Sequence, residues 1–366
     1  MAPCCMRFAI AALAVVLALN PSRGEAQGET HAPFYKGKRL NLVINFGAGG
    51  PADIEGRLVA KHIVKHIDGA PGVIVQNKEG AGGLVGINFM GELGPRDGTM
   101  AGYLTAAAWN YVIDPGSFRV PFDEYEFVAY QPVNVIYYVR ADTPPGMKSA
   151  ADIMQAKGLV TGGLAADSLK DIIIRLALDM LGVPHKHVTG FRSSAPARLA
   201  LQRGEINFFS ESSPSYFGVV EPSLTKTGQV IPVWYDPISD GRAFAPFKPM
   251  EDQQVASFPE FYRKLKGTLP TGRLWDVYRT SLAVDSAMLR SVVLPPGVPQ
   301  AAVAALRKGF ERLNGDKEFA EEALKSIQFV PQFVTGEDLN AQVRRRLVID
   351  PAIRTFVADY IKSPPK

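Results

Sequence analysis

Two clusters of glycine near the start of the chain have the composition of anion-binding turns. Gly47-Ala48-Gly49-Gly50 follows the apolar run of residues 40–46, and Gly80-Ala81-Gly82-Gly83 follows a second short run around residues 73–75. Glycine lets backbone N–H groups converge because it has no Cβ. A helix behind each turn adds unpaired N–H groups and a partial positive charge. The turns therefore predict a site for one carboxylate, and glycines that only make tight turns are the alternative.

Further candidates follow other predicted strands. Asp53 is expected to cap the helix behind the first turn and to hold the loop. Trp109 and Asn110 come just after the strand predicted at residues 100–104, where Trp109 is either a wall of the pocket or part of the core. Arg192 either meets a second acidic group of the ligand or is a plain surface arginine. The predicted ligand-binding residues are Gly47, Ala48, Gly49, Gly50, Asp53, Ala81, Gly82, Trp109, Asn110, Ser168, Arg192, Ser193, Ser194 and Ser210.

The first glycine turn also fits a different function. Gly47, Gly49 and Ala52 match the G-x-G-x-x-A variant of the dinucleotide fingerprint, and Glu79 ends the next strand where a ribose-binding acid is expected. Pro51 within the turn disfavours this interpretation. A nucleotide-binding oxidoreductase, exported or mislocalised, is therefore the alternative function.

Residues for catalysis or metal binding are sparse. His62 and His66 have the i, i+4 spacing of paired metal ligands, but Ile63 stands where an H-E-x-x-H motif has glutamate. No G-x-S-x-G motif is present. The sequence therefore predicts a protein that is not an enzyme and that needs no metal or cofactor.

Composition limits the class of protein. Apolar residues make up 46% and charged residues 21% of 366 residues, which excludes a fibrous or wholly disordered chain. The formal net charge is +4 and no basic block occurs, so a nucleic-acid partner is not expected. The length favours two domains over a single core.

Residues 1–26 have the pattern of a secretory signal peptide. Arg7 precedes the apolar run of residues 8–19, and Gly24-Glu25-Ala26 places small residues where a signal peptidase cuts. The run is too short for a permanent membrane span, and an uncleaved anchor is the alternative. Cys4 and Cys5 both lie in this segment, so the mature protein is expected to have no thiol.

Strands and helices alternate along most of the chain. Strand, glycine turn, helix and strand follow one another from residue 40 to residue 104, which is typical of a βαβ unit. Residues 127–139 look extended, and a second alternation begins after them. Residues 236–288 show no clean period. Thr335 with Asp338 resembles a capping box at the start of a late helix.

Several motifs in register resemble one family, the periplasmic receptors of tripartite tricarboxylate transporters, called Bug receptors. The first glycine turn resembles the family's P-F-x-x-G-G-x-x-D loop, with Asn45 in place of the usual proline. The second resembles its N-x-x-G-A-G-G-x-x-G loop. The matching segments are residues 45–53, 77–86, 97–100, 193–197, 203–207 and 295–299.

This resemblance implies the fold and the function. It implies a two-lobed α/β periplasmic-binding-protein (Venus flytrap) fold, in which each lobe is a mostly parallel sheet flanked by helices and two strands form the hinge. It implies a monomeric periplasmic receptor that captures a small organic carboxylate and delivers it to the transporter's membrane subunits. The expected divisions are a signal peptide (1–26), lobe 1 (27–136 plus 290–334), lobe 2 (137–289) and C-terminal helices packing across the lobes (335–366).

Overall fold

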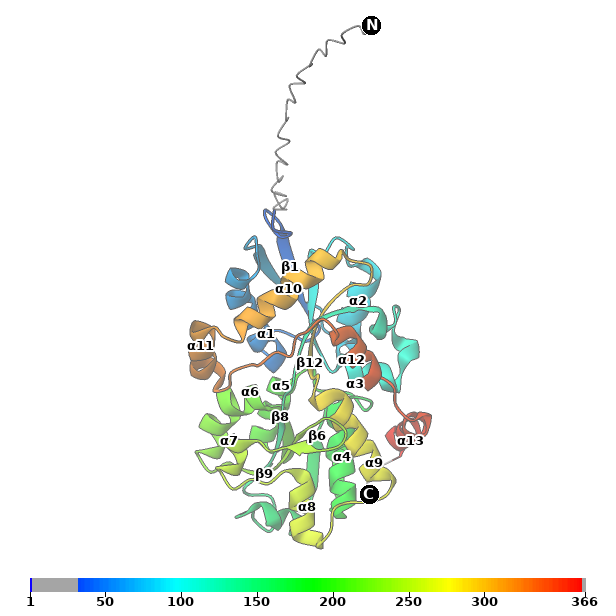
Figure 1. Ribbon diagram of the computed structural model, residues 1–366. Helices are drawn as coiled ribbons and strands as arrows, with labels where there is room; N and C mark the ends of the chain where they lie inside the picture. Colours follow the sequence, from blue (N-terminus) through cyan, green and yellow to red (C-terminus); the bar gives the residue numbers. More distant parts are fainter. Residues whose placement is uncertain (2–31, 364–366) are drawn as a thin grey trace. The chain divides into compact units, whose positions relative to one another are not determined.

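Two five-stranded mixed sheets form the framework of the chain (Figure 1). In each sheet one strand pairs antiparallel with both of its neighbours, and the other strands run in a common direction. The first sheet has the order β2 (Gly72–Asn77), β1 (Arg39–Ile44), β3 (Met100–Thr105), β12 (Arg290–Leu294) and β4 (Glu126–Gln131). The second has the order β7 (His185–Val188), β6 (Leu159–Gly162), β8 (Phe208–Ser212), β5 (Val135–Arg140) and β9 (Val230–Asp236).

The computed structural model describes Met1 and residues 32–363. The predicted signal peptide lies, apart from Met1, outside the described residues. Within the described part of the chain, no helix combines the length and the apolar character that a membrane crossing requires.

Helices cover both sheets. Those packed around the first sheet are α1 (Pro51–Ile63), α2 (Leu84–Leu93), α3 (Ala107–Ile113), α10 (Gln300–Leu313) and α11 (Lys317–Ile327). Those of the second half are α4 (Leu169–Leu181), α5 (Ser194–Arg203), α6 (Ser213–Ser215), the π-helical segment η6 (Tyr216–Thr225), α7 (Lys248–Glu251), α8 (Phe258–Lys266), α9 (Arg273–Ser281) and the π-helical turn η7 (Leu282–Ser286).

Side-chain periodicity explains why these segments bury the faces they do. Helix α10 carries Val303, Leu306, Phe310 and Leu313 at spacings of three, four and three, and all four are at most 3% exposed. Full burial of such a side chain contributes roughly 1.5–3 kcal/mol. The helical interpretation of this segment is therefore confirmed, and the same face fixes how α10 packs.

Two short segments connect the sheets. Residues 132–134 link β4 to β5, and residues 287–289 link η7 to β12. The first segment is hydrogen-bonded to the residue before the second, because the Val133 amide donates to the Ser286 carbonyl at 3.0 Å. The extended stretch of residues 127–139 is therefore two strands that belong to different sheets.

The C-terminal helices α12 (Leu339–Arg346) and α13 (Pro351–Lys362) reach both halves. Arg354 of α13 donates to the Val112 carbonyl of α3 at 2.8 Å, and Arg175 of α4 donates to the Tyr360 carbonyl of α13 at 3.2 Å. The capping box predicted at Thr335 is wrong, since α12 begins after Asp338 and has no side-chain cap. The exact lobe boundaries stay a prediction.

Two-lobed α/β architecture, predicted from the resemblance, is confirmed by the two sheets and their two connections. His62 and His66 do not face each other across a metal. Instead, His62 Nε2 lies 2.8 Å from Glu322, and His66 Nε2 lies 2.8 Å from Asp316, both on the α11 side. These histidines join α1 and the 3-10 turn that follows it (Val64–His66) to α11.

Candidate ligand-binding site

A cavity lies between the two sheets, at the edge where their parallel strands end. Thr105 at the end of β3 and Ser212 at the end of β8 both line it. Arg290 is the first residue of the antiparallel strand β12, and Val135 is the first residue of the antiparallel strand β5. Both residues line the cavity from the same edges of the two sheets. The cavity measures about 1080 Å³, its mouth to solvent included. This edge of an α/β sheet is the usual place for a ligand.

Three helices of nine or more residues begin at the cavity. Gly50 and Pro51 at the start of α1 line it, as do Ser168 before α4 and Ser194 at the start of α5. The first N–H groups of a helix have no partner inside the helix, and they carry its partial positive charge. Because the three helices come from both sheets, this end of the cavity favours a negatively charged group.

Internal hydrogen bonds hold the first glycine turn in place. Gly49 has a left-handed φ of +75°, and its amide donates to Asp53 Oδ2 at 2.9 Å. Arg57 and Asn77 both donate to Asp53 Oδ1 at 2.9 Å. Burial acts to raise the pKa of Asp53, but these hydrogen bonds lower it overall. Asp53 therefore holds the loop as predicted, but from the first turn of the helix, since the N-cap is Gly50.

The Gly49 amide, predicted as a ligand donor, is engaged within the loop. The Asp53 carboxylate already accepts its hydrogen bond, and it places a negative charge beneath the turn. A Cβ built on Gly47 would meet the carboxylate end of Glu79, an exposed and flexible side chain that can move aside, so packing does not require a glycine at this position.

The second glycine turn is braced by two asparagines. Gly80, Gly82 and Gly83 all have positive φ, and a Cβ on Gly83 would lie 2.3 Å from the Asn45 amide nitrogen. Asn45 Nδ2 donates to the Gly83 carbonyl at 3.3 Å, and Asn110 Nδ2 donates to the Gly82 carbonyl at 3.0 Å. Asn45, which stands where the Bug receptors usually have proline, thus stabilises the conformation of the loop.

The predicted site residues fall into three groups. Those that line the cavity are Gly50, Gly82, Asn110, Ser168, Ser193 and Ser194. A neighbouring pocket is lined by Ala81, Gly82 and Arg192. The residues that line neither pocket are Gly47, Ala48, Gly49, Asp53, Trp109 and Ser210.

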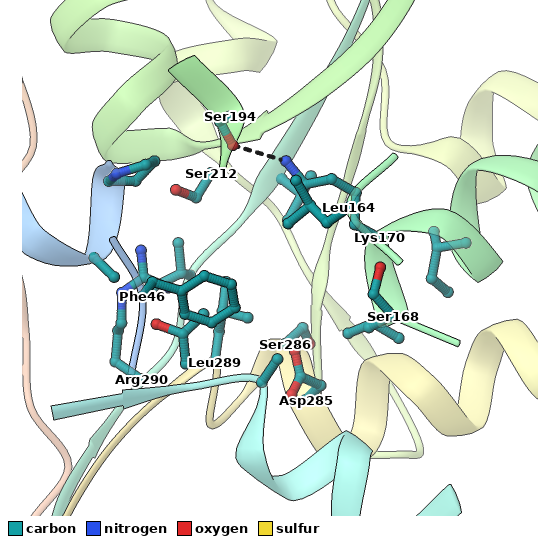
Figure 2. Close-up of a pocket in the computed structure, with 18 of the residues that line it drawn as sticks. Phe46, Leu164, Ser168, Lys170, Ser194, Ser212, Asp285, Ser286, Leu289 and Arg290 are labelled. Atoms are coloured by element: carbon teal, nitrogen blue, oxygen red, sulfur yellow. Dashed lines mark hydrogen bonds between the residues drawn. The ribbon is translucent and has the colours of Figure 1, made fainter. Parts of the chain in front are cut away.

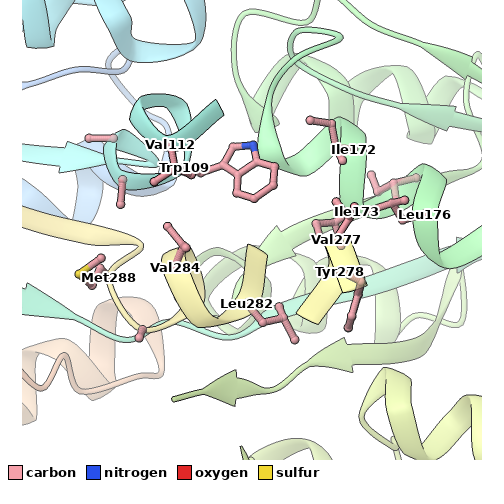
Figure 3. Close-up of a cluster of buried hydrophobic side chains, with 14 of the residues drawn as sticks. Trp109, Val112, Ile172, Ile173, Leu176, Val277, Tyr278, Leu282, Val284 and Met288 are labelled. Atoms are coloured by element: carbon pink, nitrogen blue, oxygen red, sulfur yellow. The ribbon is translucent and has the colours of Figure 1, made fainter. Parts of the chain in front are cut away.

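Trp109 belongs to the core. Its side chain is fully buried in a hydrophobic cluster that also contains Ile172 of α4 and Val284 of η7 (Figure 3). Trp109 was expected to be either a wall of the pocket or part of the core, and the structure places it in the core. Ser210 is also fully buried, and its backbone carbonyl accepts a hydrogen bond from the Lys170 ammonium that lines the cavity.

Lys170 is the main site residue that sequence reasoning missed. Its Nζ donates to Ser194 Oγ at 3.1 Å and to the Ser210 carbonyl at 2.7 Å (Figure 2). Burial lowers the pKa of Lys170 to about 8, although Glu211 and Asp171 act against this. A lysine in the first turn of a helix opposes the helix dipole. This unfavourable placement of a lysine two residues after the N-cap Ser168 was the sign in the sequence that Lys170 has a functional role.

Arg290 also lines the cavity, but its charge is neutralised. Its Nε donates to Glu55 Oε2 at 2.7 Å, and both side chains are at most 2% exposed. Gln131 donates to the other oxygen of Glu55 at 2.5 Å. Lys170 is therefore the cation of the cavity that a ligand can use most directly.

Two buried aspartates complete the polar lining. Asp236 accepts hydrogen bonds from the Tyr137 and Tyr278 hydroxyls at 2.6 and 2.5 Å. Burial raises the pKa of Asp236 to about 7 despite these donors. Burial also raises the pKa of Asp285 to about 7, against the opposing effects of the Trp109 amide and Arg290. No group of three or more His, Cys, Asp and Glu residues suited to a metal ion occurs among the residues that the structure describes.

Solved periplasmic receptors share this fold. The chain is similar to the periplasmic binding protein BugD (18% identical, TM-score 0.63, covering 89% of this chain and 98% of BugD). It is similar to MatC of Rhodopseudomonas palustris, solved with malate (17%, TM-score 0.60, 89% and 99%). It is also similar to an R. palustris protein solved with adipate (20%, TM-score 0.62, 90% and 99%).

Sequence comparison points the same way over a shorter stretch. The chain is 32% identical over 152 residues to the UPF0065 protein in the gbd 5′ region of Cupriavidus necator. The match covers 35% of this chain and 45% of that protein, so less than half of the relative is spanned. No protein-family model matches the chain. The resemblance to the Bug receptors is confirmed in the fold, which is that of a two-lobed periplasmic solute-binding protein.

Proposed function

We propose that the chain is an exported, periplasmic solute-binding receptor for a small organic carboxylate. In this proposal it delivers the ligand to the membrane subunits of a tripartite tricarboxylate-type transporter. The supporting observation is the cavity in which three helix N-termini and Lys170 converge from both sheets. A ligand that contacts both sheets shifts the balance between open and closed arrangements. The malate and adipate held by two similar proteins are ligands of this class.

The energetics favour an anion at the Lys170 end. A sheltered helix N-terminus contributes roughly 0.3–1 kcal/mol, and up to ~2 kcal/mol in favourable geometry. A hydrogen bond to a charged group contributes about 1.5–3 kcal/mol net. The Ser194 hydroxyl and the Lys170 ammonium both lie where a carboxylate oxygen could accept such bonds.

The Lys170–Ser194 pair favours binding over catalysis. A serine beside a lysine can act as a nucleophile with its base. A lysine base must be deprotonated, however, and Lys170 with a pKa of about 8 is mostly ionised at neutral pH. Its ammonium also donates to the Ser210 carbonyl. A receptor without enzyme activity is thus the simpler function for this site.

The dinucleotide alternative is disfavoured by charge and by strand order. Asp53 places a carboxylate on the Gly49 amide, where a pyrophosphate would need donors. In the first sheet β1 lies between β2 and β3, whereas the dinucleotide-binding fold places its first strand between the second and the fourth.

A thermal-shift panel tests the proposal. Mono-, di- and tricarboxylates and nicotinamide cofactors are added separately to the purified mature protein, and the unfolding midpoint is measured. We expect at least one carboxylate to raise the midpoint in proportion to the logarithm of its concentration above its Kd. Stabilisation by a dinucleotide alone would reverse the ranking of the two functions.

Export and assembly are tested separately. We expect the full chain, expressed in a Gram-negative host, to appear in the periplasmic fraction with residues 1–26 removed. We also expect a monomer in solution that has no affinity for nucleic acid. Retention of the protein in the cytoplasm, with its leader intact, would contradict the receptor proposal.

A further inference from the structure

Asp285 is an unpaired acid in the wall of the cavity. Its side chain is 1% exposed, and neither carboxylate oxygen has a side-chain hydrogen bond or an ion pair among the described residues, although the Trp109 amide is near enough to lower its pKa. Thr105 lines the same cavity, and its buried hydroxyl also has no partner in the described part of the chain. Buried polar groups are nearly always paired, so these two atoms need an explanation.

Other buried acids around the site have partners within the chain. Glu55 pairs with Arg290, and Glu211 pairs with Arg198 at 2.6 Å. Asp171 pairs with His187 at 2.7 Å, and Asp236 accepts from two tyrosines. Asp285 has no such side-chain partner, and the effects of the Trp109 amide and of Arg290, which forms its ion pair with Glu55, do not offset the cost of burying this carboxylate. Asp285 therefore has the character of a binding group and not of a structural one.

The unpaired acid lies across the cavity from the cation. Figure 2 shows Lys170 with Ser194 on one side and Asp285 with Ser286 on the opposite side. The remaining lining is mostly apolar and includes Phe46, Leu164, Ile173, Leu282 and Leu289. The cavity is thus polarised, with a positive end, an apolar middle and an acidic end.

We propose that the ligand is a carboxylate with a protonated amine at the far end of an apolar chain, and that Asp285 selects for this amine. The ligand's carboxylate meets Lys170, Ser194 and the helix N-termini. Its ammonium donates to Asp285 and to Thr105. This inference rests on the proposed receptor function and narrows its ligand to an ω-amino acid.

Matched ligands test the inference in the wild-type protein. The probes are ε-aminocaproate and adipate, which have equal chain length but opposite charge at one end, together with hexanoate, which has no second charge. Binding to the mature protein is measured by isothermal titration calorimetry at pH 8, where Asp285 is mostly ionised. We expect ε-aminocaproate to bind at least tenfold more tightly than either of the other two. The pair δ-aminovalerate and glutarate repeats the comparison at a shorter length.

Two variants assign the effect to Asp285. Asp285→Asn keeps the shape and removes the charge, and we expect it to abolish the preference for ε-aminocaproate over adipate. The matched control is Asp252→Asn, because Asp252 is exposed at the end of α7. The control is expected to keep the preference, and circular dichroism verifies that both variants fold.

The possible results distinguish a failure of this inference from a failure of the proposed receptor function. Tighter binding of adipate or hexanoate than of ε-aminocaproate by the wild type would overturn the inference and leave the carboxylate receptor standing. An unchanged preference in folded Asp285→Asn would overturn the role of Asp285. Tight binding of α-amino acids alone would overturn the placement of the amine at the far end. Absence of binding by every carboxylate would overturn the proposed function and this inference with it.

Discussion

The two sides of the cavity are built by different means. On the first-sheet side the glycine turns are held by internal hydrogen bonds, such as that from Gly49 to Asp53 and that from Asn45 to Gly83. On the second-sheet side Lys170 and Ser194 bring a charge and a hydroxyl directly to the lining. Glycine turns therefore shape the first-sheet side of the cavity, whereas side chains on the second-sheet side supply its charge.

Removing the charge on the second-sheet side should have the largest effect. Lys170→Gln takes away the cation, and truncation of one partner of a buried charged pair costs about 2–5 kcal/mol. We therefore expect carboxylate affinity, measured by calorimetry at pH 7, to fall by about 100-fold or more, since ~1.4 kcal/mol is a factor of ten. The control is Lys186→Gln, because Lys186 is exposed on β7 of the same sheet.

Unchanged affinity would contradict the assignment of the binding charge to the second-sheet side. Near wild-type affinity in Lys170→Gln would mean that the backbone of the glycine turns supplies most of the binding energy. The control variant is expected to bind as the wild type does.

Distorting the glycine turn on the first-sheet side should have an intermediate effect. Gly49 has φ +75° with open space around its Cα, so Gly49→Val costs about 1–2 kcal/mol of backbone strain without a clash. The strain shifts the start of α1, and we expect affinity to fall about tenfold, roughly the contribution of one helix end.

Gly37→Val is the matched control for the turn. Gly37 has φ +74°, an equally open surrounding, and an exposed position outside the cavity lining. We expect the two variants to lose similar stability in chemical denaturation, but only Gly49→Val to lose affinity. Equal affinities in the two variants would show that the turn does not shape the site.

The last prediction concerns the stability of the protein instead of ligand affinity, and it tests the buried acid Asp285. Burial holds the pKa of Asp285 at about 7, above its ordinary value near 4, so ionisation of this group disfavours the folded state as the pH rises. Asp285→Asn should therefore raise the unfolding midpoint relative to the wild type at pH 8, and much less at pH 5. The gain is at most roughly 2–4 kcal/mol.

The difference between variant and wild type is the quantity to measure. Asp236, whose pKa is also raised to about 7, titrates in the same window but contributes equally to both proteins. Arg290 and the Trp109 amide face Asp285 in both as well. An identical midpoint difference at pH 5 and pH 8 would mean that the pKa of Asp285 is not raised, because the group would then be ionised throughout this range in the folded and the unfolded protein alike.

Much of the fold was predictable because it follows from local patterns. The helix predicted at residues 53–66 is α1 with the short 3-10 turn Val64–His66, and the strand predicted at residues 100–104 is β3. Residues 236–288 resisted prediction because they pack through aromatic contacts without a period, such as the stacked rings of Trp275 and Tyr278. Yet this stretch supplies Asp285 and Ser286 to the cavity.

The candidate site was only partly predictable for the same reason. Gly50, Gly82, Ser168 and Ser194 were found because they sit at turns before helices, which composition reveals. Trp109 follows a strand as a wall residue would, but the cluster that encloses it comes from α4 and η7.

By itself, the amino-acid sequence determined the alternation of strands and helices, the two glycine turns and the resemblance to a receptor family. These depend on residue types at short spacing, where backbone geometry is decided locally. Only the tertiary structure decided that Asp53 occupies the Gly49 amide, and that Lys170, Arg290 and Asp285 share one cavity. Charge, burial and pairing depend on neighbours that are distant along the chain, so they exist only once the two sheets are folded.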